Sequence, residues 1–495
     1  MLETVGNLYV RAKIQWLQKL RKQALECQQN EFKHLIQEHK NTAYLKPFNL
    51  SGSYSNFAQK VPIATYEALK PFIQRTMLGE QNVLCSDPIW HFAKSSGTTD
   101  VSKFIPVSSA AMFKGHFLAS RHLLASYFER FPNNRIFSGK HLVISGSVQA
   151  IAGSKKAICG DVSALLTKQI PAWIQKLRTP DLHTALLANW DEKLQAIAQQ
   201  TFQQNVTGMS GVPSWSLELL KAIVHTAHKK NIADVWPHFE LYIHGGVNFE
   251  PYQTAFEKIL GKQVNYVNAY NASEGFFGFS DTASTRELLL LPAHGIFFEF
   301  RAVSNPNIIV PLEGVEKETV YELVISTNSG LWRYALGDTI SFTSLQPYRF
   351  VIEGRTKQYI NIAGEELMVH NAETALATVC KILDCQVHEF SAAPLFFEDG
   401  TACHQWLIEF EKLSVSIETF ESLLDSELQK INSDYHAKRN GNFVLKPLQT
   451  ILLPQGFFRS WLNEKKKIGA QFKVPRLSNS RQYANDILQF NQTHN

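Results

Sequence analysis

The sequence lacks the patterns that mark disulfide-linked, metal-binding and membrane-spanning proteins. Its six cysteines show no CxxC spacing and form no metal-ligand pattern with the seventeen histidines. No window approaches about 18 uninterrupted apolar residues, and the N-terminus has no cleavable signal pattern. We therefore expect free thiols and a cytoplasmic protein that binds no membrane.

Strong charge of either sign is also missing. The net charge is +5, from 49 basic and 44 acidic residues that are dispersed along the chain. This balance predicts no nucleic-acid-binding face. No internal repeat or low-complexity tract interrupts the 495 residues, of which 44% are hydrophobic. The chain is long enough for two or three domains, each with its own core.

One short stretch carries a strong chemical signal. An apolar run, Ile89–Phe92, predicts a buried strand that leads into small hydroxyl and glycine residues. Glycine lets backbone amides approach an anion, hydroxyl groups donate hydrogen bonds, and a lysine adds positive charge. The predicted phosphate-binding residues are Ser95, Ser96, Gly97, Thr98, Thr99 and Lys103. Because a helical pattern runs from Ser108 to about Arg130, we expect this loop between a strand and a helix start; a purely structural polar turn is the alternative.

Strand and helix patterns alternate through the first half of the chain. An amphipathic helix, or a pair, is predicted within residues 7–40, a strand at 141–145 and a helix at 184–203. Strands at 239–244 and 263–270 end in Gly245-Gly246 and in a polar turn. This alternation predicts a mostly parallel sheet whose ligands lie beyond the carboxyl ends of the strands.

The pattern then changes to β between residues 286 and 352, and helices and strands alternate again after a linker near Lys357. We expect an α/β protein with a large N-terminal domain, residues 1–355, made of mostly parallel sheets flanked by helices plus a β-rich subdomain. Residues 356–495 are expected to form a small, mobile α+β domain.

Three motifs in this order resemble the adenylate-forming superfamily of acyl-CoA synthetases, peptide-synthetase adenylation domains and luciferases. Within it the chain is most similar to the acyl-acid amido synthetases, the auxin-responsive promoter family. The three motifs are Ser95–Thr99, Tyr270–Gly275 and Tyr334–Asp338. Further likeness lies at Val61–Glu80, at Gly211–Trp215 and around Lys473.

The resemblance implies a two-step reaction that uses ATP and Mg²⁺. A carboxylic acid attacks the α-phosphorus of ATP and forms an acyl-adenylate, from which an amine, typically an amino acid, then displaces AMP. Charge that accumulates on the phosphoryl oxygens must be met by donors and by the metal. No covalent enzyme nucleophile is required.

The resemblance also assigns roles to residues. Tyr270 would stack on adenine, Ala272 and Ser273 would lie against the base and the α-phosphate, and Glu274 would hold Mg²⁺. Asp338 would accept both ribose hydroxyls, and Lys473 would enter from the small domain as the catalytic lysine. Secondary nucleotide contacts are expected at Gly245, Gly246 and Arg355. Candidate walls of the acid pocket are Phe92, Arg121, His122, Val212, Trp215 and Tyr242, although residues of these types are more often simple core.

The sequence departs from the family pattern in two motifs. Asp100 stands where many superfamily members have a glycine, and the first loop is one residue shorter than usual in this branch. Ala335 and Leu336 replace an Arg and a β-branched residue in the third motif, which leaves Asp338 intact.

Two rival functions follow from these features. A coenzyme A or carrier thioester ligase shares the first half-reaction and differs only in its acceptor. A catalytically silent nucleotide-binding protein is the second rival, favoured by Asp100 and opposed by the joint presence of Glu274, Asp338 and Lys473. The identities of the acid and the amine, and the oligomeric state, do not follow from the sequence.

Overall fold

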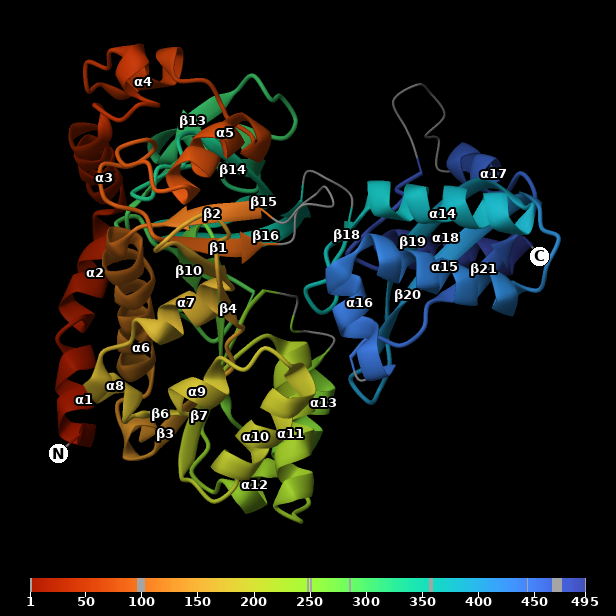
Figure 1. The fold of residues 1–495 in the computed structure, drawn as a ribbon, viewed down its shortest axis with the longest axis horizontal. Coiled ribbons are helices and arrows are strands. Elements are labelled where there is room, and N and C mark those ends of the chain that lie inside the picture. The colour runs from red at the N-terminus through yellow and green to blue at the C-terminus, as the bar shows by residue number, and fades with distance from the viewer. Residues whose placement is uncertain are drawn as a thin grey trace.

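The computed structural model describes residues 2–95, 103–246, 249, 252–284, 286–355, 359–442, 444–464 and 474–494 (Figure 1). Five residues of the predicted site lie outside the described residues. They are Ser96, Gly97, Thr98, Thr99 and Lys473.

The helices concentrate at the N-terminus, around the largest sheet and in the C-terminal part. They are α1 (Leu2–Arg11), α2 (Ile14–Lys22), α3 (Ala24–His39), α4 (Tyr54–Lys60), α5 (Tyr66–Met77), α6 (Phe117–Arg130), α7 (Val162–Lys168), α8 (Ala172–Gln175), α9 (Leu182–Ala185), α10 (Trp190–Thr201), α11 (Pro213–Thr226), α12 (Ile232–Val235), α13 (Gln253–Leu260), α14 (Val369–Leu383), α15 (Ile417–Ile431), α16 (Ser433–Arg439), α17 (Phe457–Glu464) and α18 (Gln482–His494). None of the helices in the described residues is long and apolar enough to cross a membrane.

The strands of the described residues form four sheets. They are β1 (His91–Ser95), β2 (Lys103–Val107), β3 (Lys140–Val143), β4 (Val148–Ala150), β5 (Ile158–Gly160), β6 (Arg178–Thr179), β7 (Val206–Ser210), β8 (Leu241–His244), β9 (Asn265–Ala272), β10 (Gly275–Phe279), β11 (Leu288–Leu290), β12 (Ile296–Ala302), β13 (Ile309–Pro311), β14 (Val320–Thr327), β15 (Tyr334–Leu345), β16 (Tyr348–Arg355), β17 (Tyr359–Ile360), β18 (Leu367–Met368), β19 (Gln386–Phe396), β20 (Ala402–Lys412) and β21 (Gln449–Leu453).

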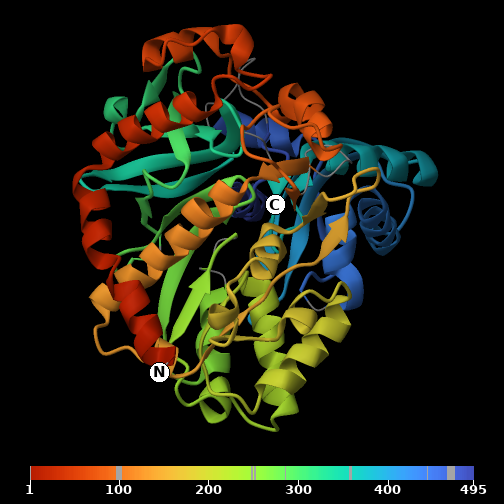
Figure 2. The ribbon, with the colours of Figure 1, turned by 60° about the vertical axis from the view of Figure 1, so that its left-hand side comes forward.

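The largest sheet joins a parallel half to an antiparallel half. Its order is β13-β12-β14-β15-β16-β11-β10-β9-β8-β7-β3-β6, and the strands from β6 to β9 run parallel. Alternating side chains of β8 enter different cores. Leu241 packs with α6 and the N-terminal helices, whereas Tyr242 packs with α11 and α13. Figure 2 shows α6 crossing this sheet on the same side as α1 and α2. The predicted parallel sheet with helical layers is therefore present.

The first motif sits differently from the prediction. β1 and β2 pair antiparallel, with Ser95 opposite Lys103, so residues 96–102 join two strands. The expected placement between a strand and a helix start was wrong. The segment after the motif is β2, which belongs to a small sheet with the strand order β2-β1-β5-β4. Its apolar side chains Ile105 and Val107 are buried. The helical turns start later, with a π-helix at Ala111–His116 that continues into α6.

Two helical predictions also needed correction. Residues 2–39 form three helices rather than one or two. The expected helix at 184–203 is split into α9 and α10, because Asn189 caps a new helix by accepting a hydrogen bond from the backbone N–H of Glu192 at 3.0 Å.

Residues 359–494 build a separate sheet and cores. β19 pairs antiparallel with β20, and β21 adds in parallel. One core lies between this sheet and helices α14 and α15, and a second includes α17 and α18. Contacts to the rest of the chain are few and specific: the Tyr252 hydroxyl donates to Ile362 O at 3.1 Å, and Lys221 Nζ donates to Asp399 O at 2.7 Å.

Candidate functional site

Two residues predicted to hold the nucleotide meet at the end of the parallel half-sheet. Tyr270, on β9, donates its hydroxyl to the Asp338 carboxylate, on β15. The two residues are 68 positions apart in the chain, so only the fold brings them together. The Tyr270 ring also contacts Phe277 edge to face at a centroid distance of 4.8 Å, which fixes the ring plane.

The backbone around Asp338 is equally defined. The backbone of Asp338 pairs with that of Arg355 in the ladder between β15 and β16, so the two residues are neighbours across the ladder. Gly337 has φ +89°, a conformation that disfavours any side chain at that position. Asp338 itself is buried. The third motif therefore presents its acid from a rigid strand.

The second motif forms a two-residue turn. Ala272 pairs with Gly275, which leaves Ser273 and Glu274 at the tip between β9 and β10. A Cβ on Gly275 would lie 2.4 Å from Ile296 Cδ1, so any larger residue here would require the Ile296 side chain to move. Asn271, at the base of the turn, accepts a 2.8 Å hydrogen bond at Oδ1 from Nδ1 of His116 in the π-helix. The sequence did not single out His116, because nothing local signals a partner 155 positions away.

Gly245 and Gly246 follow the neighbouring strand, β8. A Cβ on Gly245 would lie 2.1 Å from Ala269 O, and Gly246 has φ +84°. These glycines therefore let β8 end directly against β9, close to the motif that carries Tyr270. A structural requirement accounts for both of them, and a nucleotide contact stays a prediction.

The described edge of the first motif is tied to α5. The backbone N–H of Phe104 donates to the Tyr66 hydroxyl at 2.9 Å, and Lys103 Nζ lies 5.8 Å from the centre of the Tyr66 ring. Two residues before Tyr66, Ala64 exchanges backbone hydrogen bonds of 2.9 Å with Arg333 and Ala335. One short segment thus connects the exit of the first motif to the start of the third.

Four of the six candidate pocket walls make packing contacts in the described structure, and a role in binding the acid stays a prediction for each. Phe92 and Tyr242 are fully buried in two different cores, and the Tyr242 hydroxyl donates to Gly211 O at 3.0 Å. Arg121 lies 3.5 Å from the centre of the Tyr9 ring, and His122 stacks on Trp16. These four contacts explain the residues as packing.

The remaining two candidates, Val212 and Trp215, lie at the N-terminus of α11. Lys438, from α16 in the C-terminal part, places its Nζ 3.9 Å from the centre of the Trp215 ring. Trp215 therefore lies at the junction between the two parts of the chain, and a role in binding the acid stays a prediction.

Five buried histidines lead us to expect that the folded protein is sensitive to acid. Burial lowers the pKa of His116 and His141 to about 4 and that of His244 and His294 to about 3, and it lowers the pKa of His122 further. The unfolded chain takes up protons near pH 6.5 while the folded chain does not, so stability is full above pH 6.5 and falls as the pH drops toward 4. At one pH unit below 6.5, each buried ring is expected to have lowered the free energy of unfolding by about 1.4 kcal/mol. We expect the urea midpoint to fall steeply between pH 6.5 and 5.5.

Two variants check that this loss comes from the buried rings. His244→Leu removes one ring and should flatten the pH dependence of the unfolding free energy. His183→Gln changes an exposed histidine and should leave the dependence unchanged. A urea midpoint that stays constant down to pH 5 would contradict the prediction.

Comparisons with known proteins identify the family of the chain. The chain matches the models of the GH3 family N-terminal domain at residues 13–152 and 147–264, the GH3 family central domain at 289–355 and the GH3 family C-terminal domain at 370–482. It is 22% identical to indole-3-acetic acid-amido synthetase GH3.4 of Arabidopsis thaliana, over 96% of this chain and 92% of that protein. It is 24% identical to jasmonoyl-L-amino acid synthetase GH3.5 of Oryza sativa subsp. japonica, over 93% of each.

Solved structures share the fold over nearly the full length. AtGH3.15 acyl acid amido synthetase in complex with 2,4-DB superposes with a TM-score of 0.62 at 19% identity, covering 97% of this chain and 96% of that one. 2-Hydroxyisobutyryl-CoA ligase in its thioesterification state gives a TM-score of 0.57 at 14% identity, covering 96% and 94%. The fold is that of adenylate-forming enzymes, which confirms the predicted fold class. Because its family models together span most of the sequence, this chain belongs to the GH3 family.

Proposed function

We propose that this protein is an ATP-dependent acyl-acid amido synthetase. It would convert a carboxylic acid to an acyl-adenylate with release of pyrophosphate and then transfer the acyl group to an amine, typically an amino acid. The observation that carries the proposal is the contact between Tyr270 and Asp338, two residues of separate nucleotide motifs that converge on one edge. Membership of a family whose named relatives are amido synthetases supports it.

The nucleotide would be held by residues of all three motifs. The Tyr270 ring offers a face for adenine, and Asp338 supplies acceptor oxygens for the ribose hydroxyls. The first motif and Lys103, tied to Tyr66, would carry the phosphates. The Tyr270–Asp338 hydrogen bond orients the carboxylate before the nucleotide arrives, which lowers the ordering cost of binding.

The residues present fit a magnesium ion. Glu274 stands at the tip of a tight turn and offers hard oxygen ligands. In the described residues no group of three or more His, Cys, Asp or Glu side chains could hold a metal alone. Mg²⁺ is usually bound by one or two carboxylates together with substrate phosphates, so the single carboxylate of Glu274 could serve as its protein ligand. When bound, the ion would neutralise charge on the phosphoryl oxygens during adenylation.

The two parts of the chain would have different roles in the reaction. We propose that residues 1–355 bind ATP and the acid and that residues 356–495 form a lid that brings Lys473 to the adenylate oxygens. The lid would then turn away for attack by the amine. All six cysteines are free, which supports the reducing cytoplasm as the compartment.

One experiment separates the three candidate functions. The protein is incubated with ATP, Mg²⁺ and a panel of carboxylic acids, and pyrophosphate release is followed; amino acids or coenzyme A are then added separately and the product mass is measured. An amide mass confirms the proposal, and a thioester mass identifies a thioester ligase. If no acid in the panel gives pyrophosphate release, the remaining candidate is the catalytically silent nucleotide-binding protein.

Asp338→Ala tests the nucleotide assignment directly. We expect the KM for ATP to rise by about one to two orders of magnitude, because two charge-assisted hydrogen bonds to the ribose are lost. The variant should still fold, since the Tyr270 hydroxyl can hydrogen-bond to water. An unchanged KM for ATP in pyrophosphate-release kinetics would remove Asp338 from the ribose site. Asp384→Ala, at an exposed position far along the chain, is the control.

A further inference from the structure

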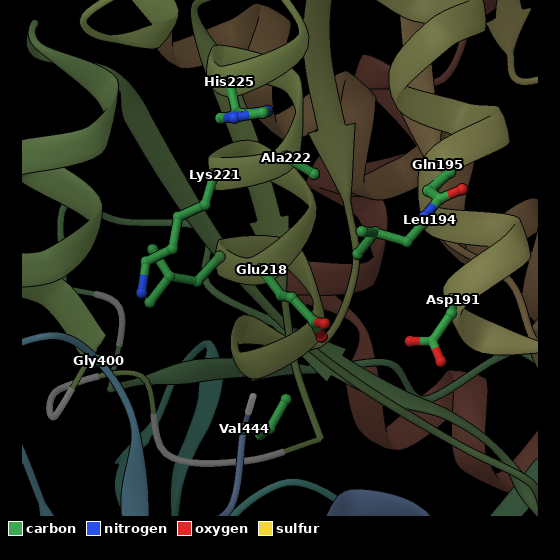
Figure 3. Close-up of a pocket in the computed structure, with 10 residues that line it drawn as sticks. Asp191, Leu194, Gln195, Glu218, Lys221, Ala222, His225, Gly400 and Val444 are labelled. Atoms are coloured by element: carbon green, nitrogen blue, oxygen red, sulfur yellow. The ribbon is translucent and has the colours of Figure 1, made fainter. Parts of the chain in front are cut away.

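A cavity of about 590 Å³ lies between α10, α11 and the C-terminal part of the chain (Figure 3). None of its lining residues belongs to the three nucleotide motifs. They are Asp191, Leu194, Gln195, Leu217, Glu218, Lys221, Ala222, His225, Gly400 and Val444. The volume falls within the range of small-molecule sites, about 300–1,000 Å³.

The lining combines aliphatic side chains with two carboxylates, which we call its acidic side. Leu194, Leu217 and Val444 supply aliphatic wall, and Figure 3 shows the Glu218 carboxylate reaching from α11 toward the space before α10, which carries Asp191. The two carboxylates come from different helices, so a cation between them would contact both sides of the cavity.

Two lysines near the cavity contact groups other than its carboxylates. Lys221 Nζ donates to Asp399 O at 2.7 Å, and the Lys438 ammonium lies over the Trp215 ring at 3.9 Å. His225 is exposed at the far end of the cavity. Within the described part of the chain, the one hydrogen bond of the Glu218 carboxylate comes from Trp190 Nε1 at 2.9 Å. The acidic side is therefore not balanced by an ion pair within hydrogen-bond distance.

We propose that this cavity binds a primary ammonium compound with a branched apolar body, separately from the nucleotide site. The ammonium would lie between Glu218 and Asp191, and the apolar body would pack on Leu194 and Leu217. A primary amine satisfies the acidic side with up to three donors, and a carboxylic acid of the same shape would be repelled.

Proton linkage gives the site a distinctive signature. Burial raises the pKa of Glu218 to about 7; the charge of Asp191 acts in the same direction, and those of Lys221 and Lys438 oppose it. At pH 7 the carboxyl group is therefore partly protonated in the empty site. A bound ammonium favours the charged form, so binding releases a fraction of a proton.

The occupant would contact both parts of the chain. Gly400 and Val444 belong to the C-terminal part, and the other walls belong to α10 and α11. Gly400 has φ +78°, and a Cβ there would lie 2.2 Å from Leu217 Cδ2. Gly400→Ala must therefore move either the Leu217 side chain or the turn, which changes the wall of the cavity without replacing either carboxylate.

Calorimetric titration of the full-length protein with 3-methylbutylamine at pH 7, without ATP, tests the proposal. The amine should bind, and the apparent enthalpy should differ between two buffers of different ionisation enthalpy because a proton is released. Glu218→Gln keeps an acceptor for Trp190 and should weaken binding about tenfold or more and abolish the buffer dependence. Glu192→Gln, an exposed change on the same helix as Asp191, should bind as the wild type does.

Several outcomes would overturn the proposal. They are absence of binding at millimolar amine, equal affinity in Glu218→Gln, and equally tight binding of 3-methylbutanoate, which has the same skeleton and the opposite charge. If Glu218→Gln fails to fold, Asp191→Asn and Gly400→Ala take its place, and unchanged affinity in both would overturn it. The titration uses no ATP, so its result is independent of pyrophosphate release, which tests the proposed synthetase activity.

Discussion

Replacement of Lys473 by alanine is expected to lower the rate of adenylation by about 10²–10³-fold while leaving ATP affinity within a few-fold of wild type. A charge that meets the phosphoryl oxygens only in the transition state affects kcat rather than binding. Lys473 lies outside the described residues, but the chain that follows it is held firmly. Ser391 Oγ donates to Pro475 O at 2.7 Å, and the Ala392 N–H donates to Arg476 O at 2.8 Å.

Two kinetic measurements test this prediction. Pyrophosphate release in a single turnover should slow in Lys473→Ala, whereas attack of the amine on a supplied acyl-adenylate should proceed at nearly the wild-type rate. Lys412→Ala, which removes a half-exposed lysine from the same part of the chain, is the matched control. Equal adenylation rates in Lys473→Ala and wild type would exclude this lysine from the mechanism.

The largest effect on stability is expected for Arg333→Met. Arg333 makes two hydrogen bonds of 2.9 Å to the Glu299 carboxylate and one of 2.7 Å to each of the carbonyl oxygens of Ala58 and Val61. Only 6% of the Arg333 side chain and 1% of the Glu299 side chain are exposed. Methionine would leave a buried charge without its counter-ion and two carbonyls without donors. We expect a loss of about 3–5 kcal/mol in the free energy of unfolding.

Urea unfolding of a small set of variants identifies the cause. Arg333→Met combined with Glu299→Met should recover much of the loss, because the stranded charge is gone. Arg333→Lys should fall between wild type and Arg333→Met, since an ammonium cannot reproduce the planar fork. Arg75→Met breaks an exposed pair with Glu80 and should leave the free energy of unfolding nearly unchanged. A similar small loss in Arg333→Met would contradict the argument.

Continuous apolar runs made much of the fold predictable. The β pattern expected between residues 286 and 352 corresponds to β11 through β16, and the alternation of strands and helices before residue 270 correctly predicted the parallel half-sheet. The meeting of Tyr270 with Asp338 was expected from the family motifs, and the hydrogen bond between them agrees with it. Local pattern and motif order were sufficient for these features.

Other features depend on distant partners and left no local signal. β2 carries a proline and follows hydroxyl-rich residues, so its pairing with β1 was missed. Arg333 acquires its importance only from Glu299, 34 residues earlier, and from the carbonyls near α4. His122 packs against Trp16 and contacts His294, two partners that the sequence did not single out, and its place in the acid pocket stays a prediction. Polar residues of this kind are assigned by tertiary contacts that periodicity does not encode.

The antiparallel pairing of Ser95 with Lys103 has an evolutionary consequence. The ladder between β1 and β2 fixes where both strands stand, whatever the number of residues that connect them. Insertions, deletions and charge changes in that connection, such as Asp100, can therefore accumulate without disturbing the surrounding sheet. The phosphate contacts proposed for this connection can therefore change at little cost to the folding of the sheet.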